Sequence, residues 1–144
     1  MEQENINFQI KGIELLEVNL NNPQVPLNPE RIYHFNINVE QRINKDEKLV
    51  IIITAVDLIH EPDKLCHATI KTSCVFFVGN MLDFVSPNTR QIDLPGHFII
   101  ALNSISLSTT RGIMFSQFKG TFMHHVLLPI LDPSTLTLTK LNAE

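Results

Sequence analysis

A strict two-residue alternation between Tyr33 and Glu40 limits the folds open to this chain more than any other feature of its sequence. Apolar Tyr33, Phe35, Ile37 and Val39 alternate there with four polar residues. Successive side chains of a strand point to opposite faces, so this period predicts a β-strand with one buried face. A strand needs partners for its backbone N–H and C=O groups, and the chain must therefore contain a sheet.

Two more strands follow at once. Residues 48–58 include the β-branched run Val50 to Thr54, and a continuous run of this kind predicts a central strand that is covered on both faces. Residues 65–78 have the composition of the next strand. Short polar turns at 44–46 and 60–63 join the three segments, which predicts an antiparallel meander.

A further strand is expected over residues 8–20, ahead of the meander. Its apolar alternation changes phase at Gly12-Ile13 and again at Leu15-Leu16. A strand with bulges explains both changes, and Gly12 suits a bulge. A helix is the competing interpretation, because the apolar residues also fit a helical spacing. We favour the strand. Residues 21–29 contain three prolines, which predict an extended crossover.

The pattern changes after Val85. Residues 97–119 lack proline and predict a helix, with a break near Ser106–Ser108 because Ser and Thr are weak helix formers. Gly120 is placed as its C-terminal stop. Residues 122–133 are expected to be extended or loop, and a short terminal helix is expected from Asp132 through Lys140.

The composition favours one domain over residues 1–144, with loose ends at 1–6 and 141–144. The chain is 44% hydrophobic and only 18% charged, below the roughly 25% charged residues of an average domain. So few charges leave apolar surface for subunit contacts or a binding groove, and we therefore expect an oligomer.

Charge and segment length exclude several classes of function. The net charge is −4 and no stretch gathers Lys and Arg, which argues against nucleic-acid binding. No apolar run approaches the roughly 18–20 residues of a membrane span, and the acidic first residues differ from a signal peptide. The sequence therefore predicts a cytoplasmic protein without a membrane partner.

The cysteines agree with that location. Cys66 and Cys74 fall on one predicted strand, eight residues or about 26 Å apart, which is too far for a disulfide. Two buried, reduced thiols are expected.

No catalytic or cofactor motif is evident. His124 and His125 are adjacent on a chain expected to be extended, so their side chains should point apart. The other histidines appear scattered through the sequence, and His67 is expected to face outward near Asp63. No phosphate loop or nucleophile elbow is present, and the acidic residues fall mostly in turns. We therefore expect no enzyme, no metal and no cofactor.

The order of these features resembles the SecB family of export chaperones. The segments that carry the resemblance are Phe8-Gln9-Ile10, Pro29-Glu30 before the alternating strand, Leu65-Cys66 before a strand ending in Phe76-Phe77, and Gly120-Thr121-Phe122 with Leu127 and Pro129. Together they cover residues 8–133. The resemblance implies an α+β fold: a four-stranded antiparallel sheet with C-terminal helices packed on it.

The resemblance also implies a function. SecB-type proteins are ATP-independent holdases that bind unfolded or newly made polypeptides, assemble as homotetramers (dimers of dimers), and dock on the SecA motor for protein export. This chain has His67 where the family has an acidic residue, and it lacks the long acidic tail. Both differences favour the wider SecB-like group, some of whose members guard an antitoxin.

Apolar residues that could serve such a role fall into two sets. A client-binding groove is expected between the crossover and the terminal helix, formed by Val25, Leu27, Leu136 and Leu138, with Phe35, Ile37 and Val39 as its floor. Subunit contacts are expected at Leu65, Ala68 and Ile70. Plain core packing is the alternative for the floor, and ordinary sheet packing is the alternative for the second set.

Two further functions stay open. A structural oligomer of the same fold would use all of its apolar surface for self-assembly. A small-ligand protein would need a cavity with converging polar groups, which the sequence does not show.

Overall fold

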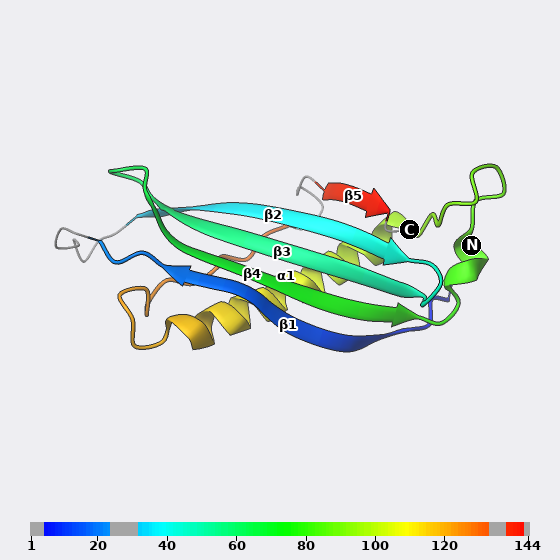
Figure 1. The fold of residues 1–144 in the computed structure, drawn as a ribbon, viewed down its shortest axis with the longest axis horizontal. Helices are drawn as coiled ribbons and strands as arrows, with labels where there is room; N and C mark the ends of the chain where they lie inside the picture. The colour runs from blue at the N-terminus through cyan, green and yellow to red at the C-terminus, as the bar shows by residue number, and fades with distance from the viewer. Residues whose placement is uncertain (1–4, 24–31, 133–137, 143–144) are drawn as a thin grey trace.

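A computed structural model describes residues 5–23, 32–132 and 138–142, which form a sheet with one long helix against it (Figure 1). The order along the chain is β1 (Phe8–Leu20), β2 (Tyr33–Asn44), β3 (Leu49–His60), β4 (Cys66–Val78), the short 3-10 helix η1 (Met81–Phe84), α1 (Gly96–Phe118) and β5 (Leu138–Asn142). The strands lie in the order β1-β4-β3-β2-β5. The predicted α+β architecture is confirmed.

The first four strands pair antiparallel, and β2, β3 and β4 form the predicted meander. β3 lies in the middle of the sheet, as its β-branched run predicts. β1 lies beside β4, and its pairing shifts register between Ile10 and Gly12 and between Leu15 and Glu17. Both predicted bulges are therefore confirmed, and the helical alternative for this segment is excluded.

The predicted short terminal helix is wrong. Residues 138–142 form β5, which pairs in parallel with β2. Thr and Leu alternate from Thr135 to Thr139, a period of two that suits a strand. Pairing with β2 also satisfies backbone groups that a free sheet edge would leave open. β5 runs to Asn142, whereas the sequence predicts a loose end from residue 141.

Helix α1 is continuous, so the predicted break at 106–108 is also wrong. The hydroxyls of Ser106, Thr109 and Thr110 donate to the carbonyl oxygens four residues earlier, at 2.7–2.8 Å. These side chains thus bond within the helix instead of competing with its backbone ladder. The helix ends as predicted, because Gly120 has a φ of +79°, a conformation that favours glycine.

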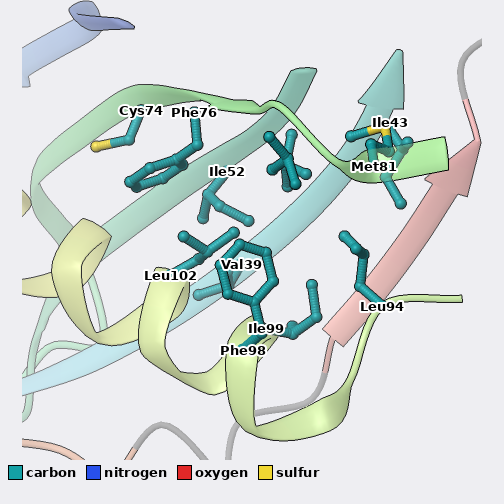
Figure 2. Packing of buried hydrophobic residues seen from close by; sticks show 12 residues of the cluster. Val39, Ile43, Ile52, Cys74, Phe76, Met81, Leu94, Phe98, Ile99 and Leu102 are labelled. Carbon is teal, nitrogen blue, oxygen red and sulfur yellow. The ribbon is translucent and has the colours of Figure 1, made fainter. Parts of the chain in front are cut away.

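The core lies between α1 and one face of the sheet. In Figure 2, Phe98, Ile99 and Leu102 of α1 lie against Ile52 and Phe76 of the central strands. A second cluster continues the core towards the other end of α1 and includes Met123 and Leu128 of the following loop. By length and composition alone α1 could cross a membrane, contrary to our reading of the sequence. Its sheet-facing side is buried, however, and core helices pass the same test.

The residues just before β1 are attached to the sheet. The carbonyl of Asn5 accepts a hydrogen bond from Asn80, and the backbone N–H of Asn7 donates to Asn80 Oδ1. Ile6 packs against the core. The loose start expected over residues 1–6 therefore does not reach Asn5 and Ile6.

Candidate functional site

The edge strand β1 presents a row of apolar side chains on the face that α1 occupies. Each of these residues pairs with a β4 residue that is buried in the core, and directly paired residues share a face. Five of them stay 37–50% exposed because α1 covers only part of β1: Phe8, Ile10, Ile13, Leu15 and Val18. We call these five residues the β1 row.

The two bulges are what align the β1 row. Without them, the residues between the two bulges, including Ile13 and Leu15, would lie on the opposite face, because the side-chain period of a strand is two. The bulges insert Lys11 and Leu16 and so return Ile13 and Val18 to the helix side. Glu14 and Glu17 consequently lie on the other face, and the β1 row carries no charge.

β1 is also a sheet edge. Among the described strands it pairs only with β4, over 13 residues. Its other edge offers backbone N–H and C=O groups for a further strand. An apolar row beside an open edge can hold an extended polypeptide through side chains and backbone together.

The solvent-facing side of α1 is uncharged as well. Its exposed residues at helical spacing are Ala101, Ser104, Ile105, Ser108, Gly112 and Phe115. The one charged residue of α1, Arg111, bends towards the following loop and donates to the carbonyl oxygens of Leu128 (2.7 Å) and Pro129 (2.9 Å). We call these six residues the α1 outer face.

The expected client groove is described only in part. Phe35 and Ile37 are half-buried on β2. Phe35 packs against the second core cluster, and Ile37 packs against both clusters. Val39 is fully packed in the core, so the packing alternative holds for this residue. Val25, Leu27 and Leu136 lie outside the described residues, and for Leu138 only its backbone place in β5 is given.

The expected subunit contacts separate in the same way. Ala68 and Ile70 have no exposed surface, because α1 and the loop after it cover their face of β4. They pack in the core and are not available to a second subunit. Leu65, at the turn before β4, is 60% exposed and remains a candidate contact.

A polar cluster appears where the sequence predicts none. The prediction that His67 faces outward is wrong: its side chain is 3% exposed and its ring stacks on that of His60, with 4.6 Å between centroids. Asp63 lies beside both rings. A bulge in β4 brings His67 inward, since Leu58 pairs with Ala68 and Ile59 with Cys66, which leaves His67 as the extra residue.

The sequence matches no family model and no curated protein. Among solved structures, the chain is similar to the SecB-like chaperone Rv1957 of Mycobacterium tuberculosis, which was solved in complex with a ChAD peptide from the antitoxin HigA1. The TM-score is 0.64 at 12% identity, over 86% of this chain and 89% of that one. A protein of unknown function from Streptococcus agalactiae gives a TM-score of 0.43 at 10% identity, over 88% and 99% of the two chains. The first likeness shows that the fold is SecB-like.

Proposed function

We propose that this protein is an ATP-independent holdase that binds unfolded or newly made polypeptides. The observation that carries the proposal is the β1 row beside an open sheet edge. Unfolded chains share apolar side chains and unpaired backbone groups, and this surface has complements for both. The SecB-like fold, seen in a chaperone that was solved with a peptide, supports the same function.

Self-assembly is the second part of the proposal. The α1 outer face exposes six uncharged residues, and a surface helix normally carries charges on its solvent side. Contact with α1 of a second copy would bury this face. An oligomer also multiplies the binding sites for one long client, which raises its avidity without new contacts.

Aggregation of a slow-folding client, followed by light scattering without nucleotide, tests the proposal. We expect the wild-type protein to suppress aggregation at a severalfold excess and to elute with the client on a sizing column. A protein that stays monomeric and leaves the client to aggregate would contradict it.

A charge introduced into the β1 row tests whether this row binds the client. Ile13→Glu places a carboxylate among apolar neighbours at a half-exposed position, so the fold should persist while suppression is largely lost. Gln9→Glu is the matched control: it adds the same charge to the same strand on the opposite face, and should suppress aggregation like the wild type. Equal suppression by both variants would move client binding away from β1.

A dedicated antitoxin partner is a second candidate, favoured by the antitoxin peptide in the complex of the Mycobacterium tuberculosis protein. A general holdase binds many unfolded clients with similar affinity, whereas a dedicated one prefers a single peptide. Competition among unrelated unfolded peptides, measured by fluorescence anisotropy, separates the two. A structural oligomer without chaperone activity would bind none of them.

A further inference from the structure

The turn between β3 and β4 gathers two imidazoles and a carboxylate at one end of the sheet. Nδ1 of His60 lies 3.0 Å from Oδ1 of Asp63, and Nε2 of His67 lies 3.6 Å from Oδ2. One ligand atom from each residue can be chosen so that all three lie within 4.8 Å of one another. Imidazole nitrogen and carboxylate oxygen are donors that first-row divalent metals prefer in proteins.

The backbone holds these side chains in place. The N–H of His60 donates to the carbonyl of Leu65 (2.9 Å), and the N–H of Lys64 donates to the carbonyl of His60 (2.8 Å). Lys64 has a φ of +58°, an uncommon conformation for a residue with a side chain, which closes the turn tightly. The β4 bulge then turns His67 towards the turn. The three residues are thus assembled by the fold and not by chance collisions of surface side chains.

The surroundings suit a metal ligand set. Nδ1 of His67 lies 3.0 Å from the Tyr33 hydroxyl, which leaves Nε2 to face Asp63. A hydrogen bond on the second ring nitrogen fixes the orientation of metal-binding histidines. The backbone N–H of Leu65 donates to Asp63 Oδ1 (3.0 Å) and so helps to fix the orientation of this carboxylate.

His60 is the residue whose ring must turn for the set to share one ion. Its ring lies nearly parallel to that of His67, with 17° between the planes, and its buried Nδ1 has no aligned hydrogen-bond partner among the described residues. A shared ion needs the in-plane lone pairs of both rings to converge, about 2.0–2.1 Å from each nitrogen. His67 is held by Tyr33, so the required turn about the Cβ–Cγ bond falls to His60.

We propose that His60, Asp63 and His67 form a binding site for a first-row divalent metal ion such as Zn²⁺, with water completing the coordination on the exposed side of Asp63. The ion would join the turn to the bulged start of β4. This site is separate from the β1 row and does not depend on the chaperone proposal.

Calorimetric titration of the untagged protein with Zn²⁺ near pH 7.5 tests the site. We expect one ion per chain, and an affinity at least about tenfold lower in His60→Gln and in Asp63→Asn, because each removes a ligand. These two residues are more exposed than His67, so the variants should keep the fold; far-ultraviolet circular dichroism checks this. His125→Gln, which changes an exposed histidine outside the cluster, is the matched control and should bind like the wild type.

Co²⁺ gives an independent measurement, because its visible absorption reports coordination number and geometry. Wild type and His125→Gln should give the same spectrum, and Asp63→Asn should lose it. No binding by the wild type, or equal binding by Asp63→Asn and His60→Gln, would overturn the proposal. Neither result would touch the aggregation assay, so the two proposals fail separately.

Discussion

The two cysteines of β4 differ in their surroundings, although the sequence predicts that both are buried. Cys74 has no exposed surface and lies in the core beneath α1. Cys66 is half-buried at the start of the strand, where its thiol donates to the carbonyl of Ala68 (3.3 Å). Burial raises the pKa of the Cys74 thiol, against smaller opposing effects of hydrogen bonds with Ser106 and Thr109. Cys74 is therefore protonated and shielded in the folded protein.

This contrast predicts selective alkylation. Iodoacetamide should modify Cys66 in the native protein and reach Cys74 only after unfolding, because the thiolate is the nucleophile. Mass spectrometry of Cys66→Ala, which retains Cys74 alone, checks the assignment. Rapid alkylation of native Cys66→Ala would show that the core over Cys74 opens readily.

The raised pKa of Cys74 also makes the free energy of unfolding depend on pH. The folded pKa of Cys74 is raised, so its contribution is complete below the pKa of the unfolded thiol, about 8.5. It is lost as the pH rises from there through the folded value, because the unfolded state alone releases the proton. The free energy of unfolding should therefore decline more steeply with alkaline pH in the wild type than in Cys74→Ala. Parallel slopes would contradict this.

The inward position of His67 in the histidine cluster could not be predicted from the sequence. His60 and His67 are seven residues apart, and a regular strand would have sent His67 to the outer face. The bulge that reverses it depends on how Leu58 and Ile59 pair with β4, which is a property of two strands and not of one. In β1, by contrast, the phase changes in the apolar pattern reveal both bulges directly.

At the scale of elements, α1 has a sequence that favours its own structure only weakly. Its Ser and Thr residues lower the helix propensity, which led to the predicted break. Tertiary packing overrides that preference, because Ser106 and Thr110 are buried against the sheet and bond within the helix. The β-strands follow from the sequence more directly, because the two-residue alternation is visible in each strand whichever strand it pairs with.

A charge introduced into the α1 outer face should weaken self-assembly. In the proposed oligomer, Ser108→Glu places a charge at the centre of this face and should shift the equilibrium towards monomer, because a carboxylate buried between helices loses its hydration. Gln117→Glu is the matched control: nine residues are two and a half turns, so Gln117 points away from Ser108 although it is also exposed. Multi-angle light scattering measures the mass. Equal masses for both variants would place the subunit contact elsewhere.

At the scale of the whole molecule, a buried hydrogen bond between Thr72 of β4 and Thr110 of α1 joins the sheet to the helix. Thr110 donates to the carbonyl of Ser106, so in its 2.8 Å contact with Thr72 the Thr72 hydroxyl is the donor. Both hydroxyls are fully buried. The bond therefore fixes the position of α1 on β4 where apolar packing alone would allow sliding.

Thr110→Val should lower the free energy of unfolding by about 1–3 kcal/mol, because it leaves the Thr72 hydroxyl without its acceptor. Replacing both residues by Val removes the unpaired group, so the double variant should cost less than the two single variants together. Urea denaturation measures all four proteins. Simple additivity would mean that the two hydroxyls do not act as a pair.

The global architecture was more predictable than the functional surface. Strand order, the meander and the single sheet follow from periodicity and short turns, which act locally along the chain. The burial of Ala68 and Ile70 does not follow from the sequence, because their apolar side chains suit a core and a subunit interface equally well. Only the position of α1 decides that they are core, and that the β1 row is left exposed.

The apolar length of α1 has a consequence for the chain as it leaves the ribosome. Before it packs on the sheet, α1 is a 23-residue segment that is long and apolar enough to span a membrane by length and composition alone. The strands β1 to β4 precede it and are synthesised first. At roughly 5–20 residues per second, the 23 residues of α1 take about 1–5 s to emerge, whereas hairpins form within about 10 μs. The hairpins that join β2, β3 and β4 therefore have time to form before α1 has emerged, and they offer it an apolar face.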